Sequence, residues 1–204
     1  MSNEILINVS PQETRVALVE QGLLQEIFIQ RSSHVGVMGN IYKGRVERVL
    51  PGMQAAFIEV GLSRTAFLHA SDIVIHSEVI DEVTENHLVR QDIRDLVRDG
   101  QDIVVQVVKD PIGTKGARLT TDITLPSRYL VFMPSVSHVG VSQRIEDEQE
   151  RERLKTLVQT FCDDEGGFIL RTAAEGAKED ELSQDAQFLR RLWNKVKLRK
   201  KERK

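Results

Sequence analysis

The sequence lacks most of the features that would tie it to a disulfide framework, a membrane or a thiolate metal site. It contains a single cysteine, Cys162, which excludes an internal disulfide and a zinc site built from several thiolates. No apolar run approaches the roughly 20 residues that a membrane-spanning helix needs. The N-terminus has no basic stretch followed by an apolar one, so we expect no signal peptide and a cytoplasmic protein.

Recognisable catalytic groups are missing as well. The sequence has no Ser-His-Asp grouping and no phosphate-binding glycine loop, and its five histidines are scattered without the spacing of metal ligands. The expected strands 4–9 and 14–20 carry no pair of carboxylates that could hold two metal ions. We therefore predict neither a catalytic residue nor a metal site in this chain.

Aromatic residues are scarce, at 5%, yet three of them fall within residues 39–71. These are Tyr42, Phe57 and Phe67. The same segment carries the cations Lys43, Arg45, Arg48 and Arg64. Bases stack on flat rings while Lys and Arg follow the phosphates, so this mixture predicts a surface for single-stranded nucleic acid.

Charge is unevenly distributed along the chain. The formal net charge is −3, so any nucleic-acid site must be a local basic patch. Residues 72–102 hold nine acids against three arginines, whereas the strands on either side hold seven basic residues against four acids. Within the acidic stretch, helical spacing predicts an amphipathic helix that ends at Gly100. Its apolar positions are Val89, Ile93, Leu96 and Val97.

Alternation and turn residues predict an α+β chain. A three-stranded meander is expected at 4–9, 14–20 and 23–30. Five further strands, at 41–49, 52–60, 64–68, 103–109 and 117–123, match the small OB-fold barrel. Strands at 128–133 and 167–171 then alternate with helices at 146–163 and 178–197. A barrel inserted into an α/β domain explains this order; two side-by-side domains are the alternative.

Strand alternation separates the two sides of residues 55–60. Ala56, Ile58 and Val60 suit the barrel core, which places Phe57 on the outer face together with Glu59. Phe57 and Phe67 would then stack bases. The alternative is that one or both rings fill the core.

Two further segments carry cations in positions that suit phosphate. The turn between Lys109 and Arg118, which includes Lys115, could clamp phosphate at the barrel rim, or could be an ordinary solvated hairpin tip. Arg171 and Thr172 directly follow a short buried strand, where a guanidinium and a hydroxyl suit a terminal phosphate monoester. The alternative is a plain strand end with a surface arginine. The basic tail after Trp193 fits either RNA contact or a solvated helix end.

Three segments together resemble the ribonuclease E/G family of bacterial endoribonucleases. They read GNIYKGRVERVLPGMQAAFIEVG, VVKDPIGTKGARLTTDITLPSRYLVFMP and GGFILRTAAEG, and the likeness runs from Asn3 to Lys201. It implies an RNase H-like subdomain at 1–38 and 125–204, interrupted by an S1-type OB-fold at 39–124 that binds RNA.

The same resemblance implies roles for individual residues. Phe57, Phe67 and Lys115 match positions that hold single-stranded RNA, with Lys109 as a weaker match. Lys43 is a further candidate because of the charge and rings of its own segment. Arg171 and Thr172 match a 5′-monophosphate sensor, with Val131 and Arg144 matching its lining. Ser127 stands where the family pattern has glycine.

The resemblance also implies what this chain does not contain. The family's catalytic aspartates, its Mg²⁺ site and its zinc-binding cysteines belong to a later region, so we expect the chain to bind RNA without cutting it. The partner would be single-stranded RNA, preferably 5′-monophosphorylated, and the full-length protein could form a homo-oligomer. The rival hypotheses are a stand-alone RNA-binding regulatory module and a scaffold whose barrel binds protein.

Overall fold

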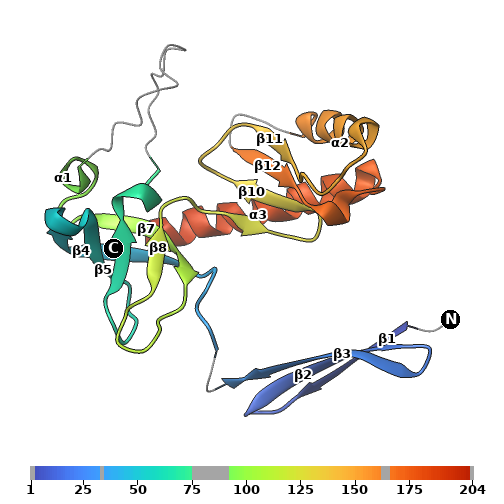
Figure 1. Cartoon of the computed structure of the whole chain (residues 1–204), viewed down its shortest axis with the longest axis horizontal. Helices are drawn as coiled ribbons and strands as arrows, with labels where there is room; N and C mark the ends of the chain where they lie inside the picture. Colours follow the sequence, from blue (N-terminus) through green and yellow to red (C-terminus); the bar gives the residue numbers. More distant parts are fainter. Residues whose placement is uncertain (1–2, 33–34, 75–91, 162–165, 203–204) are drawn as a thin grey trace. The chain divides into compact units, whose positions relative to one another are not determined.

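The computed structural model describes residues 3–32, 35–74, 92–161 and 166–202. The chain forms two compact units, Met1–Met38 and Gly39–Lys204 (Figure 1). The predicted domain limits at residues 38 and 124, and the RNase H-like nature of the flanking parts, stay predictions.

The first unit is an antiparallel meander. Its strands are β1 (Asn3–Val9), β2 (Glu13–Glu20) and β3 (Leu23–Arg31), with β2 in the middle. Gln21 and Gly22 connect β2 to β3 with positive φ angles of 52° and 77°, as a two-residue hairpin turn requires. The three expected strands are confirmed to within one residue at each end.

The second unit begins with a closed five-stranded barrel, in the order β4-β5-β6-β8-β7. Its strands are β4 (Ile41–Leu50), β5 (Ala55–Glu59), β6 (Ala66–His69), β7 (Asp102–Lys109) and β8 (Arg118–Thr120). Short 3-10 turns follow β4 and β6, namely η2 (Pro51–Met53) and η3 (Ala70–Asp72). The interior is filled by alternating side chains that include Val46, Ile58, Leu68, Val105, Val107 and Leu119. The prediction of an OB-like barrel is confirmed.

The helix expected between the strands of the barrel is wrong in extent. Among the described residues of this stretch only α1 (Ile93–Leu96) is helical, capped by Asp92, and Val97 already has extended backbone angles of −143° and 155°. By leaving the helix, Val97 becomes buried beside the barrel, at 2% exposure. Gly100, with φ of 80°, belongs to the turn before β7, where its amide donates to the Val46 carbonyl oxygen. Val89 lies outside the described residues.

The buried Gln106 side chain links the chain segment that enters the barrel to the segment that leaves it. The Gln106 side-chain amide donates to the carbonyl oxygens of Gly39 and Thr124, at 3.0 and 2.9 Å. Its oxygen accepts the Thr124 backbone amide at 2.9 Å. Since Gln106 is only 5% exposed, these bonds satisfy a side chain that would otherwise be costly to bury.

The remainder of this unit is a four-stranded sheet, β11-β12-β10-β9, with two helices. The strands are β9 (Leu125–Pro126), β10 (Leu130–Met133), β11 (Val139–Val141) and β12 (Gly167–Leu170). The helical elements are α2 (Glu148–Gln159), η4 (Thr172–Ala174) and α3 (Glu179–Glu202). α2 packs on β11, and α3 packs on β10 (Figure 1). The sheet and helices enclose a core in which the rings of Phe132 and Phe168 lie 5.1 Å apart.

The predicted helices are both present, with shifted ends. α2 begins after Asp147, whose carboxylate accepts the Gln149 and Glu150 amides and so caps the helix. α3 continues five residues beyond its expected end at residue 197, to Glu202. Cys162 lies outside the described residues. In the part of the chain that the structure describes, no helix is long and apolar enough to cross a membrane.

Candidate nucleic-acid interface

Two phenylalanine rings lie next to each other on the outer face of the barrel. Phe57 in β5 is paired with Phe67 in β6, and both alternate with buried neighbours such as Ile58 and Leu68. The ring centroids are 6.3 Å apart, and the rings meet edge to face at 65°. Both rings are only half-buried, so their outer surfaces are available to stack bases.

A third ring adjoins this pair. The His69 imidazole lies 6.4 Å from the Phe67 ring, tilted by 35°. Its Nδ1 accepts the Ser71 backbone amide at 3.2 Å, which fixes the ring on the outer face of β6. Sequence reasoning had assigned His69 no role, because ligand spacing was the only signal sought for the histidines.

Cations flank the rings in the same transverse row. Strand pairing sets Arg48 opposite Phe57, Phe67 beside Arg118, and Arg118 opposite Lys109. Together with the pair of Phe57 and Phe67, this places one residue from each of the five strands side by side. The ring row, defined as Arg48, Phe57, Phe67, Arg118 and Lys109, thus has aromatic residues in its middle and cations at its ends.

The cations of the ring row differ in how they are held. Arg118 forms a two-pronged ion pair with Asp72, at 2.8 and 3.1 Å, and this carboxylate raises the pKa of the guanidinium. No described residue pairs with the Arg48 or Lys109 side chain. Because no described carboxylate offsets their charge, Arg48 and Lys109 attract an anion more strongly than Arg118 does.

Lys115 lies in a loop that is fastened beside the rings. The Arg64 guanidinium donates to the Gly113 carbonyl oxygen, and the Phe67 amide donates to the Ala117 carbonyl oxygen at 2.8 Å. A side chain at Gly116 would collide with the Thr65 carbonyl oxygen, so the loop approaches the backbone before β6 very closely. Lys115 itself is exposed.

Lys43 lies apart from the ring row. It is paired with Val104 of β7, and its ammonium is 3.4 Å from the Asp102 carboxylate. The structure therefore brings Phe57, Phe67 and Lys109 together, and holds the loop of Lys115 next to them, but it places Lys43 at the junction of β4 and β7.

A second cluster surrounds Arg171 at the end of β12. The guanidinium donates to the Ser127 carbonyl oxygen, and the Arg171 backbone amide donates to the Tyr129 carbonyl oxygen at 2.8 Å. Thr172 begins η4, and its hydroxyl is 3.3 Å from that of Ser142. Arg171 and Thr172 are both exposed, so their polar groups can reach a ligand.

The two predicted lining residues, Val131 and Arg144, belong to different segments of this unit. Val131 of β10 is half-buried and is paired with Ile169 of β12. The Arg144 backbone amide donates to the Ser142 hydroxyl at 3.4 Å, and no described residue pairs with the Arg144 side chain. The Ser142 hydroxyl thus links the segment of Arg144 to Thr172.

α3 holds the loop that carries Ser127. One oxygen of Asp185 accepts the Ser127 hydroxyl at 2.6 Å and the amides of Tyr129 and Leu130 at 3.0 and 3.1 Å. Glu181 accepts the Lys178 amide and the Tyr129 hydroxyl, and these bonds lower the pKa of its carboxyl group. The bond to Glu181 also raises the pKa of Tyr129. Sequence reasoning missed Asp185, since nothing in the sequence links it to a loop more than fifty residues earlier.

No group of three or more His, Cys, Asp or Glu side chains within the described ranges could hold a metal ion. The arrangement offers rings, guanidinium groups and ammonium groups, which bind and orient a polyanion.

Comparisons with known proteins agree with the resemblance noted in the sequence. Residues 124–204 match the model of the ribonuclease E/G family. The chain is 66% identical over 197 residues to ribonuclease G of Haemophilus influenzae, covering 97% of this chain and 40% of that protein. It is 64% identical to ribonuclease G of Escherichia coli K12, over 98% of this chain and 41% of that protein.

The chain belongs to the ribonuclease E/G family. Ribonuclease E of Haemophilus influenzae is more distant, at 37% identity over 95% of this chain and 20% of that protein. The chain thus spans about two fifths of the length of the ribonuclease G sequences that it matches. The family model covers the whole Arg171 cluster, whereas the barrel precedes it.

Proposed function

We propose that this chain is the RNA-recognition part of a ribonuclease G-like endoribonuclease that cuts single-stranded RNA. The ring row carries the proposal. Two half-buried rings, flanked by cations that no described residue pairs with, lie on one barrel face and fit a flexible strand whose bases can splay onto the rings. Lys115 extends the positive charge beyond the row.

We further propose that Arg171 and Thr172 recognise the 5′-monophosphate of the RNA. A guanidinium supplies parallel donors to phosphate oxygens, and a terminal phosphate monoester exposes more oxygens and more charge than a diester does. The Ser127 carbonyl oxygen orients Arg171, while Val131 and Arg144 complete the lining. This pair therefore selects the end of the strand, and the barrel binds its body.

The remaining proposals concern the whole protein. The parts at 1–38 and 125–204 would form an RNase H-like subdomain around the S1-type barrel. Catalysis would depend on Mg²⁺, and the assembly on structural Zn²⁺, both held by residues outside this chain. The enzyme would act in the cytoplasm as a homo-oligomer, in ribosomal RNA 5′-end maturation and in messenger decay.

One binding experiment separates the two recognition elements. Single-stranded RNAs of identical sequence, ending in 5′-monophosphate or 5′-hydroxyl, are titrated against the parent chain and the variants Phe57→Ala and Arg171→Ala. Phe57→Ala should weaken the binding of both RNAs equally, by about 1–3 kcal/mol for each lost base stack. Arg171→Ala should abolish the preference for the 5′-monophosphate and leave binding of the 5′-hydroxyl RNA largely intact.

Unaltered RNA affinity in Phe57→Ala would refute the role of the ring row and favour a barrel that binds protein. An equal 5′ preference in Arg171→Ala and the parent would refute the sensor. Incubation of the pure chain with RNA and Mg²⁺ supplies a third result, since we expect no cleavage. Cleavage that a point mutation within this chain abolishes would contradict its assignment as a recognition part.

A further inference from the structure

A cleft of about 520 Å³ opens between the barrel and the C-terminal part of α3. The barrel contributes the start of β7 and the turn before it, from Gln101 to Val104, together with Thr121 and Ile123. α3 contributes Trp193, Val196, Lys197 and Lys200. None of the five residues of the ring row lines this cleft, so a ligand here would make contacts of its own.

The α3 side of the cleft combines a ring with two cations. Trp193, Lys197 and Lys200 are spaced four and three residues apart, so they lie on one face of the helix. Trp193 is the single tryptophan of the chain, and it is half-buried against the apolar core together with Val104. Lys197 and Lys200, which lie in the helical turns that follow Trp193, also line the cleft.

The opposite wall is mainly apolar, with one acid. Ile103, Val104 and Ile123 give it a surface on which a flat ring can lie. Asp102 is the acid of the lining, and its carboxylate is 3.4 Å from the Lys43 ammonium. The Lys43 charge offsets that of Asp102, so the cleft as a whole stays positive.

We propose that this cleft binds one nucleotide of single-stranded RNA, with the base between Trp193 and Val104 and the phosphate at Lys197 and Lys200. This inference rests on the proposed RNA-binding function and adds a second site to it. The volume lies within the range of about 300–1,000 Å³ that small-ligand pockets occupy.

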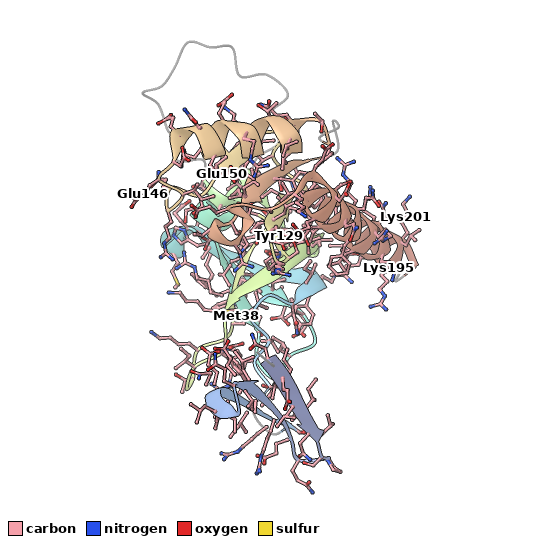
Figure 2. All side chains as sticks on the ribbon, turned by 90° about the vertical axis from the view of Figure 1, so that its right-hand side faces the viewer. Met38, Tyr129, Glu146, Glu150, Lys195 and Lys201 are labelled. Carbon is pink, nitrogen blue, oxygen red and sulfur yellow. The ribbon has the colours of Figure 1, made fainter. Side chains whose placement is uncertain are left out.

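Charge favours an RNA strand over a protein segment as the occupant. The last turn of α3 carries Arg199, Lys200 and Lys201, of which Lys200 lines the cleft, and Figure 2 shows Lys195 and Lys201 on this part of the helix. Such a density of cations beside a ring matches a polyanion that carries bases. A neutral or basic peptide would offer these cations no anionic group.

Trp193 provides the measurement, because a stacked base quenches indole fluorescence. A 5′-hydroxyl RNA of about ten nucleotides, within the usual site size of single-strand binders, is titrated while fluorescence and polarisation are recorded together. We expect quenching that saturates with binding. Lys200→Ala should raise the RNA concentration at half-quenching about three- to tenfold, as the loss of one phosphate contact implies.

Lys195→Ala is the matched control. It removes the same charge from the same exposed helix, but Lys195 does not line the cleft, so half-quenching should stay at the parent concentration. Equal shifts in the two variants would mean diffuse attraction and overturn the site. Phe57→Ala should lower the overall affinity and preserve the quenching at saturation.

The remaining outcomes separate this site from the proposed function. If polarisation shows saturated RNA binding while Trp193 is not quenched, the proposed site in the cleft is wrong and the proposed role of the ring row stands. A complete lack of RNA binding overturns the proposed function itself. Quenching by adenosine monophosphate but not by the RNA strand would assign the cleft to a free nucleotide. Quenching that rises with protein concentration in the absence of RNA would assign it to a second copy of the chain. Either result overturns the RNA proposal.

Discussion

Arg48 and Lys109 show how single residues reach the outer barrel face that we propose binds RNA. Strict alternation from the buried Val46 and Val107 would turn both cations toward the core. A register shift follows each valine, between Val46 and Arg48 and between Val107 and Lys109. Each bulge adds one residue to its strand and re-aims the next side chain outward, so Arg48 meets Phe57 and Lys109 meets Arg118.

Arg48→Ala should weaken RNA binding more than Arg45→Ala does. Arg48 is unpaired within the described residues and lies beside Phe57, whereas Arg45 is opposite Glu59 and donates to the Gly100 carbonyl oxygen at 3.2 Å. The affinity should fall several-fold for Arg48→Ala, and the slope of log K against log salt should decrease by about 0.7, as one lost phosphate contact implies. Salt titrations of both variants provide the measurement, and equal slopes would count against the ring row.

At the scale of elements, α3 organises the loop that orients Arg171. Asp185 accepts three hydrogen bonds from residues 127–130, and the Ser127 carbonyl oxygen in turn accepts the Arg171 guanidinium. The helix was predictable from its apolar spacing. Its contact with the loop depended on how the helix docks on β10, which sequence spacing does not encode.

Asp185→Ala should both destabilise the protein and reduce the 5′-monophosphate preference. The change leaves the Tyr129 and Leu130 amides without their acceptor, at a cost of about 1–3 kcal/mol for each group that stays buried. Asp180→Ala is the control, since Asp180 is exposed on the first turn of the same helix. Thermal unfolding and paired RNA titrations test this. If Asp185→Ala is much less stable but keeps the 5′-monophosphate preference of the parent chain, the loop does not position Arg171.

At the scale of the whole molecule, carboxylates that link separate segments make folding depend on pH. Arg153 donates twice to Glu150 at 2.7 Å, and the Gly176 amide donates at 2.9 Å. The bonds from Arg153, followed by the Gly176 amide, lower the pKa of Glu150 from 4.5 to about 2. α2 is thereby joined to the segment that leads into α3.

The Glu150 contribution to stability should be complete above pH 4.5 and should disappear as the pH falls toward 2. A lowered folded-state pKa means that the unfolded chain binds more protons over this range, so acid favours unfolding. Glu150→Gln should flatten the dependence of the unfolding free energy on pH between these values. Glu146→Gln, on an exposed residue before α2 (Figure 2), should follow the parent curve, and a flattened curve there would contradict the assignment.

The sequence by itself determined the element types and the faces that alternation controls. The β-branched runs of the meander and barrel, the caps at Asp92 and Asp147, and the outward direction of Phe57 all follow from local chemistry. Local patterns also located Arg171 at the end of a buried strand. Even a local pattern failed at Val97, because burial against the barrel outweighed one more turn of helix.

Only the tertiary structure decided which of these residues act together. The bulges turned Arg48 and Lys109 outward, Gln106 joined Gly39 to Thr124, and Asp185 fastened the loop of Ser127. Each of these contacts joins segments distant in sequence, and its energy depends on register and docking rather than on neighbouring residues. The same reason applies to the cleft at Trp193, whose lining comes from α3 on one side and from the start of β7 on the other.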